Sequence, residues 1–152
     1  MIDPLVYEKL TAYCAYRERC ISEVKQKLKR LTQAETDAIT YINKLQQENY
    51  LNEERYVKAF VSGHIRKKWG KTKITAALRQ KGINAALIQI HLTPIDETDY
   101  REQLLKAAAQ KLKSLKTGTG YEKKIKLVRF LLGKGYESSM VDSVAKELMS
   151  KQ

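Results

Sequence analysis

The stretch with the most distinctive chemistry, residues 66–82, reads RKKWGKTKITAALRQKG. Seven of its seventeen residues are Lys or Arg, none is acidic, and Trp69 and Gly70 are adjacent in its middle. Cations at this density can neutralise phosphates, and an indole can stack on a base or fill a protein pocket. Three interpretations are open: a nucleic-acid-binding segment, a protein-docking face, or a solvated helical surface.

The candidate contact residues are the cations of this stretch with its tryptophan, and a second basic group nearer the C-terminus. They are Arg66, Lys67, Lys68, Trp69, Lys71, Lys73, Arg79 and Lys81, with Lys123, Lys124, Lys126 and Arg129. We expect Lys73 and Lys81 on the exposed side of their helix. The alternative for the cations is an ordinary charged surface, and the alternative for Trp69 is a packed hinge residue. Six further cations between residues 17 and 30 are diluted by Glu18 and Glu23, which favours an ordinary surface there.

The distribution of charge is more informative than its total of +12. Residues 1–54 contain eight basic and nine acidic side chains, and residues 96–152 contain twelve and eight. Residues 55–95 contain nine Lys or Arg and no Asp or Glu. Solvated surfaces normally intersperse both signs. The middle of the chain therefore predicts a face for a polyanion or for an acidic groove of a protein.

The sequence offers no constellation typical of catalysis, metal binding or a cofactor. Cys14 and Cys20 lack matching Cys/His pairs, and His64 and His91 are isolated, so we expect two reduced, half-buried thiols. The TGTG at residues 117–120 lacks the spacing of a phosphate-binding loop. We therefore expect no enzyme activity, no metal and no cofactor.

The length of 152 residues suits one domain, or several small units that share a continuous core. The apolar runs are too short to span a membrane. The opening residues, MIDPLVYEKL, lack the layout of a secretory signal. These features favour a cytoplasmic protein.

The apolar pattern is helical throughout, and Pro occurs only at positions 4 and 94, so we predict an all-α fold. Helix starts are predicted at residues that can cap free backbone amides. These are Asp3, Ser22, the Thr32–Glu35 capping box, Asn52, Asn84, and Ser138 or Ser139, with a restart at Thr72 after Gly70. The predicted core includes Ile39, Ile90, Ala109 and Ile125 among the apolar residues at helical spacing.

The chain contains an internal repeat. Ile74-(x3)-Leu78-(x3)-Gly82 aligns without a gap on Leu127-(x3)-Leu131-(x3)-Gly135, and Val24-(x3)-Leu28 fits the same pattern. Each unit has about 45–50 residues and three helices, which is too small to be very stable alone, so neighbouring units should stack. We predict three tandem three-helix repeats, at residues 1–50, 51–95 and 96–152, stacked into an elongated curved rod.

Residues 49–83, NYLNEERYVKAFVSGHIRKKWGKTKITAALRQKGI, resemble the second repeat of the RecX family, regulators of the RecA recombinase. YCAYRERCISEVKQKL at residues 13–28 is similar to the opening helix, basic turn and second helix of that family. The third unit matches only in its apolar pattern. One departure is Gly70-Lys71, where the family often has Gly-Pro.

The resemblance implies a modulator rather than an enzyme. RecX-like proteins bind in the groove of RecA filaments on single-stranded DNA, suppress ATP hydrolysis, strand exchange and co-protease activity, and can limit filament extension. Many also bind single-stranded and double-stranded DNA weakly and without sequence preference. The resemblance therefore implies a RecA filament and DNA as partners, and we expect a monomer. Two other functions remain open: a free-standing, non-specific DNA-binding protein of helix-turn-helix-like units, and a scaffold that binds only proteins.

Overall fold

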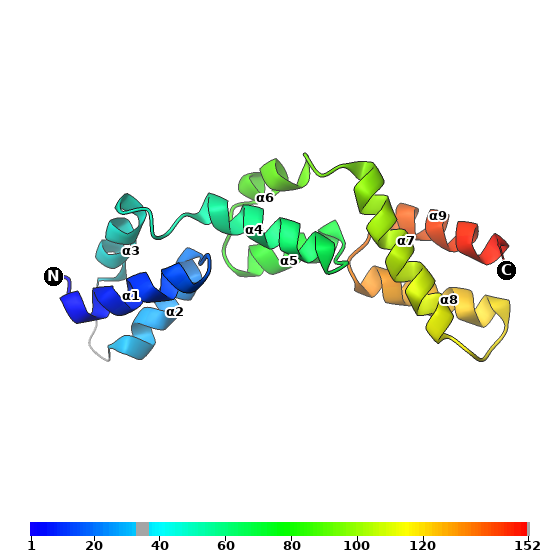
Figure 1. The fold of residues 1–152 in the computed structure, drawn as a ribbon, viewed down its shortest axis with the longest axis horizontal. Helices are drawn as coiled ribbons and strands as arrows, with labels where there is room; N and C mark the ends of the chain where they lie inside the picture. The colour runs from blue at the N-terminus through cyan, green and yellow to red at the C-terminus, as the bar shows by residue number, and fades with distance from the viewer. Residues whose placement is uncertain (33–36, 152) are drawn as a thin grey trace.

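The computed structural model describes residues 1–32 and 37–151, and these ranges contain nine helices and no strand. The predicted all-α class is confirmed. The helices form three successive groups, called here the first, second and third units (Figure 1). They are α1 (Pro4–Tyr16), α2 (Ile21–Leu31) and α3 (Ala38–Gln47); α4 (Glu53–Arg66), α5 (Lys71–Gln80) and α6 (Ala85–Leu92); and α7 (Glu97–Ser114), α8 (Gly120–Gly133) and α9 (Ser138–Ser150).

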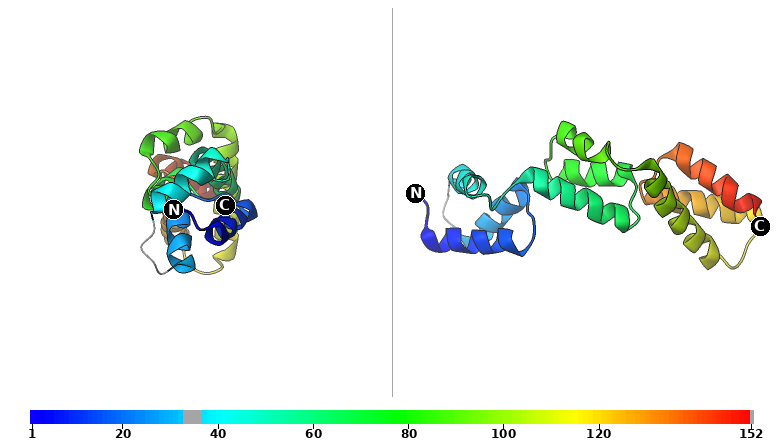
Figure 2. Two further views of the ribbon diagram at one scale, coloured as in Figure 1. Left: turned by 90° about the vertical axis from the view of Figure 1, so that its left-hand side faces the viewer. Right: turned by 45° about the horizontal axis from the view of Figure 1, so that its top comes forward.

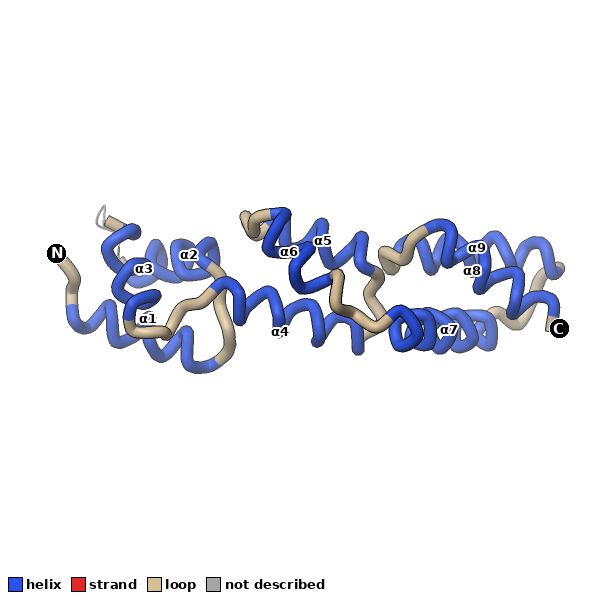
Figure 3. Tube along the Cα trace, turned by 90° about the horizontal axis from the view of Figure 1, so that it is seen from above, coloured by secondary structure: helices blue, strands red, loops and turns tan. Residues whose placement is uncertain are grey.

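The three units follow one another along a rod, with the two termini at opposite ends (Figures 1 and 2). Seen from above, the first helix of each unit follows one long edge of the rod, and the other two helices lie along the opposite edge (Figure 3). This is the predicted elongated stack of three-helix repeats. No helix in the described ranges is long and apolar enough to cross a membrane.

Helix starts agree with the sequence where a capping side chain is present. Asp3, Asn52 and Asn84 each accept a hydrogen bond from a free amide of the first turn, as predicted. The predicted cap at Ser22 is wrong, because α2 begins at Ile21 and the side chain of Glu23 accepts the hydrogen bond of the Cys20 amide. The carboxylate of Glu23, the third residue of the helix, thus reaches back to the amide of the residue before it.

Two other predicted starts also change. The last helix begins at Ser138 after Glu137, so neither Ser138 nor Ser139 is its cap, and α5 begins at Lys71 rather than Thr72. The box predicted at Thr32–Glu35 extends outside the described residues. α3 begins at Ala38, after Asp37.

Helix ends repeat one geometry. At the ends of α5 and α8, Gly82 and Gly135 have positive φ, and the amides that follow them bond to Leu78 and Leu131. Lys68 takes the same left-handed position at the end of α4, with φ 65°, although it carries a side chain. Gly70, the residue expected to break α4, instead precedes the first residue of α5.

Each unit has its own buried core, and the aligned repeat positions occupy it. The residues of the α2, α5 and α8 pattern are all almost fully buried: Val24 and Leu28, Ile74 and Leu78, and Leu127 and Leu131. Burial of each such side chain contributes roughly 1.5–3 kcal/mol. The gapless alignment of residues 74–82 and 127–135 is thus also an alignment of structure, and Ile83 and Tyr136 after it are both buried.

Four predicted core residues lie on the surface instead. Ile39, Ile90 and Ile125 are 65%, 58% and 40% exposed, and Ala109 is exposed, whereas Tyr41 and Ala107 are buried on the same helices. A three-helix unit covers only part of each helix. Apolar residues at the margin of a helical stripe therefore remain in solvent, although the periodicity includes them.

The joint between the second and third units is built from backbone. The Gly70 amide donates to the Lys134 carbonyl at 2.7 Å, and the Thr72 amide donates to the Gly135 carbonyl at 3.0 Å. A Cβ on Gly70 would lie 2.1 Å from the carbonyl carbon of Gly135, so glycine is required for this approach. Ile65 and Ile95 pack against the cores of both units.

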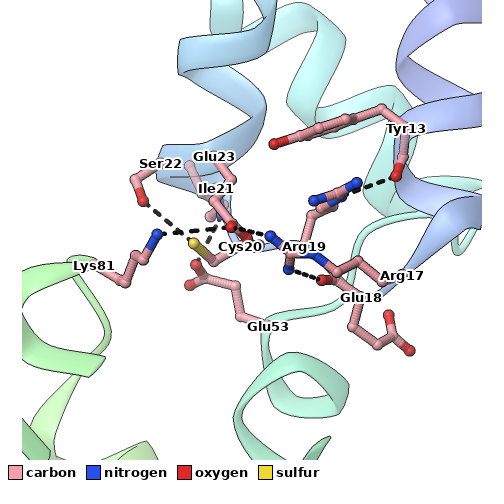
Figure 4. Close-up of polar contacts among 10 residues, drawn as sticks. All are labelled: Tyr13, Arg17, Glu18, Arg19, Cys20, Ile21, Ser22, Glu23, Glu53 and Lys81. Atoms are coloured by element: carbon pink, nitrogen blue, oxygen red, sulfur yellow. Dashed lines mark hydrogen bonds and ion pairs between the residues drawn. The ribbon is translucent and has the colours of Figure 1, made fainter. Parts of the chain in front are cut away.

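The joint between the first and second units is largely ionic (Figure 4). Glu23, 6% exposed, accepts a hydrogen bond from Arg17 at 2.8 Å and lies 3.6 Å from the ammonium of Lys81 in the second unit. Glu53 accepts the hydrogen bond of the Ile21 amide at 3.0 Å. The side chain of Cys20 is fully buried in the core of the second unit.

Candidate polyanion-binding surface

The basic stretch at residues 66–82 spans the end of α4, a short turn and α5. Aromatic rings line the turn: Phe60 and His64 stack at 3.9 Å between centroids, and Trp69 meets His64 edge-on at 4.4 Å. The ammonium of Lys73 lies 4.1 Å from the centroid of the Trp69 ring. Trp69 is half-buried in this group, which agrees with a packed hinge. That it also contacts a partner remains a prediction.

Three lysines from two units meet beside this turn. Burial and the positive charges of Lys73 and Lys68 together lower the pKa of Lys134 below the ordinary value for lysine. The charges of Lys68 and Lys73 in the second unit therefore repel that of Lys134 in the third unit. An anion bound between them would relieve that repulsion.

Lys134 was not among the candidates from sequence. The repeat contained a signal for it, because the alignment that places Gly82 on Gly135 also places Lys81 on Lys134. Its proximity to Lys68 and Lys73 follows from stacking of the second and third units, which no local pattern reveals.

Lys71 is anchored as well as charged. Its amide donates to the hydroxyl of Tyr100 at 2.9 Å, and that hydroxyl in turn donates to the Glu137 carboxylate. Its ammonium lies 4.7 Å from the centroid of the Tyr100 ring. A proline at position 71, as in the Gly-Pro that the family often has here, could not donate the first of these bonds.

The expectation that Lys73 and Lys81 face solvent is only partly correct. Lys81 is ion-paired with Glu23 and so joins two units, and Lys73 is half-buried with its ammonium over Trp69. The Lys81 contact crosses the joint between the first and second units, whereas the Lys73 contact lies within the second unit. Arg66, Lys67 and Arg79 are exposed.

The cations of the third unit lie on α8, which runs from the C-terminal end of the rod back toward the joint (Figure 1). Lys126 and Arg129 are exposed, and Lys123 and Lys124 are half-buried. They lie nearer the outer end of α8 than Lys134 does. The structure therefore presents two basic groups along the rod, rather than one merged patch.

The sequence favoured an ordinary charged surface for the basic group of the first unit, but part of this group is structural. Arg19 is 8% exposed, donates to the Tyr13 carbonyl at 2.9 Å and stacks over the Tyr13 ring (Figure 4). Arg17 is paired with Glu23. These two guanidinium groups hold the turn between α1 and α2.

The cysteine thiols differ from expectation in their burial. Cys14 and Cys20 are both free and buried rather than half-buried, and burial raises the pKa of the Cys14 thiol. Among the described residues, no three or more His, Cys, Asp or Glu side chains lie where they could hold a metal ion.

These features define a class: an all-α protein of tandem three-helix repeats that carries two groups of basic side chains along its second and third units. Residues 52–92 match the family described as "RecX, second three-helix domain", and residues 98–144 match "RecX, third three-helix domain". Taken with the relatives below, these matches show that the chain belongs to the RecX family of regulatory proteins.

Relatives match most of the chain. Regulatory protein RecX of Clostridium botulinum (strain Eklund 17B / Type B) is 34% identical over 146 residues, which cover 88% of this chain and 68% of the relative. Regulatory protein RecX of Acinetobacter baylyi is 30% identical over 129 residues, 82% of this chain and 76% of the relative. The crystal structure of RecX from Lactobacillus salivarius superposes with a TM-score of 0.80 at 24% identity, covering 94% of each chain, and supports the fold.

Proposed function

We propose that this protein modulates a RecA-type recombinase by lying along the RecA filament on single-stranded DNA. The observation that carries the proposal is the basic surface of the second and third units, in a chain of the RecX family. Residues 55–95 contain no acidic side chain, and Lys68 and Lys73 meet Lys134 across a stacked joint. An elongated shape suits a partner that is itself a long, DNA-filled groove.

The mechanism is occupancy. The rod contacts several filament subunits, and its cations bind acidic protein surface or the phosphates of the bound DNA. A filament held in this way cannot make the subunit rearrangements that ATP turnover needs. Suppression of ATP hydrolysis, strand exchange and co-protease activity follows from that restraint, and a monomer is sufficient for it.

The proposal is tested by titrating the protein into RecA hydrolysing ATP on single-stranded DNA. We expect hydrolysis to fall as the protein approaches the filament concentration. Unchanged hydrolysis at a molar excess would contradict the regulator function.

The surface is tested by charge reversal. Lys67→Glu/Lys68→Glu/Lys71→Glu should raise the concentration needed for half-inhibition at least tenfold, because attraction becomes repulsion at three positions. The matched control is Lys25→Glu/Lys29→Glu/Arg30→Glu, which reverses three exposed charges of the first unit and should change inhibition much less. Equal effects of the two variants would remove the assignment to residues 66–82. Circular dichroism checks that both variants are folded.

The same charge supports a second candidate, a free-standing DNA-binding protein. This function predicts tight binding to duplex DNA at physiological salt with no effect on RecA. A scaffold that binds only proteins predicts neither DNA binding nor steep salt dependence.

A further inference from the structure

The outer face of α8 in the third unit is apolar and uncovered. Tyr121, Ile125 and Leu132 are 75%, 40% and 45% exposed, and half-buried Val128 lies between them. These residues recur at helical spacing along one side of the helix. With Lys124 and Arg129 they line a shallow hollow of about 460 Å³.

The repeat itself shows that the fold does not require this apolar face. The alignment that brings the buried residues of the three units together places Ile125 on Thr72 and Ser22, and Leu132 on Arg79 and Lys29. The other two units therefore keep polar residues at positions where the third unit has exposed isoleucine and leucine. The same helix packs well in all three units, so the difference belongs to the surface and not to the core.

The charges beside the face indicate what kind of molecule covers it. Lys123, Lys124, Lys126 and Arg129 lie on the same helix, and its one carboxylate, Glu122, is hydrogen-bonded to the Thr119 hydroxyl. Two copies of this chain meeting through α8 would bring those cations against each other, in a protein of net charge +12. A partner with acidic residues beside an apolar stripe would bind through burial of the apolar face and through attraction between opposite charges.

We propose that the α8 face docks an amphipathic helix of another protein, with an apolar stripe flanked by acidic side chains. Apolar side chains of that helix lie over Ile125, Val128 and Leu132, and its carboxylates pair with Lys124 and Arg129. This surface is separate from the lysines that meet at the joint of the second and third units. It assigns the basic residues of α8 to a protein contact rather than to DNA phosphates.

The test uses the full chain and two synthetic 18-residue peptides, with no recombinase or DNA present. Both peptides carry leucine at i, i+3, i+4 and i+7; one has glutamate and the other lysine at the flanking positions. Fluorescence anisotropy should show binding of the glutamate peptide, and at least tenfold weaker binding of the lysine peptide. No binding to the wild-type protein, or equal binding of the two peptides, would overturn the proposal.

The face is then located with matched variants. Ile125→Thr/Leu132→Gln should weaken binding of the glutamate peptide at least tenfold, whereas Ile39→Thr/Ile90→Gln, which introduces the same polar side chains at two other exposed apolar positions, should leave it unchanged. Both variants alter exposed residues only, so both should fold, and thermal unfolding checks this. Equal loss in the two variants would overturn the assignment. Sedimentation that shows wild-type self-association abolished by Ile125→Thr/Leu132→Gln would overturn it too, because the occupant would be a second copy.

Discussion

At Gly70 a single methyl group would occupy space that the backbone of Gly135 and Tyr136 already fills. The contact is reciprocal, since a Cβ on Gly135 would lie 2.2 Å from the Cβ of Lys73, and Gly135 also has a φ of 91°. Each glycine thus serves the joint between the second and third units. A Cβ on Gly63, in the C-terminal half of α4, would instead point into open space.

The two glycine positions make opposite predictions. Gly70→Ala should lower the free energy of unfolding by at least about 3 kcal/mol, because rigid backbone cannot move away from the new methyl group. Gly63→Ala should raise it by about 0.5–1 kcal/mol, because alanine is a better helix former with nothing to collide with. Urea unfolding followed by circular dichroism measures both. A neutral Gly70→Ala would mean that the units do not approach this closely.

Lys68 and Ile125 each have a property that the local sequence pattern does not predict. Lys68 reads as one more cation in a basic tract, and nothing in the local pattern says that it closes α4 in the left-handed conformation. Ile125 reads as core, because periodicity cannot tell a margin of the stripe from its centre. Both properties depend on what stacks against the helix.

At the scale of elements, the polar contacts around Glu23 join α2 to the second unit. Burial alone would raise the pKa of this carboxyl, but hydrogen bonds from Arg17 and the Cys20 amide, with the nearby charges of Arg17 and Lys81, lower it overall. A carboxyl with a lowered folded-state pKa stabilises the fold above its unfolded pKa, which is about 4.3. That contribution to stability is lost as the pH falls from about 4.3 through the folded-state pKa of Glu23.

Replacing this carboxylate should therefore change the acid response. Glu23→Gln should destabilise the protein by roughly 1–3 kcal/mol at neutral pH, because Arg17 and Lys81 lose their partner. It should also flatten the fall in stability below about pH 4.3. Urea unfolding between pH 3 and 7 checks both effects, with exposed Glu8→Gln as the control. Parallel pH profiles for Glu23→Gln and the wild type would show that Glu23 does not titrate abnormally.

The helices themselves were largely predictable, and their boundaries were less so. Asp3, Asn52 and Asn84 carry a local capping signal, so the structure agrees there. The start of α2 depends on the Glu23 carboxylate reaching the Cys20 amide, and Glu137 at the start of α9 is held by Tyr100. These starts are set partly by tertiary contacts, which a scan for serine caps misses.

At the scale of the whole molecule, the two joints differ in kind. The second and third units share Ile65 and Ile95 between their cores and exchange backbone hydrogen bonds. The first unit is attached through ion pairs and the buried Cys20 side chain. A unit of about 50 residues is marginally stable alone, so its opening depends on what its joint contributes.

Hydrogen exchange should divide the chain accordingly. Buried amides of α4 to α9 should exchange with one common free energy of opening, and those of α1 to α3 should open at a lower one. Glu23→Gln should lower the value for the first unit further and leave the other two nearly unchanged. A single free energy of opening for all nine described helices would show that the joints are equivalent.

The order of units and the all-α fold were available from the repeat, because the spacing of Ile74, Leu78 and Gly82 recurs at Leu127, Leu131 and Gly135. The side chains that meet at the joints could not be predicted from the repeat. Lys134 lies 61 residues from Lys73 in the chain, and Lys81 lies 58 from Glu23. Their meeting follows from how the units stack.

The close approach of Gly70 to Gly135 also has a mechanical consequence. Backbone clamped to backbone resists bending, whereas ion pairs between long side chains tolerate it, so the rod is a stiff arm of two units with a shorter arm hinged to one end. On a partner whose pitch changes, the stiff arm keeps its register and the short arm swings to follow. Bending strain then concentrates at residues 17–23 and 49–55, on either side of that hinge.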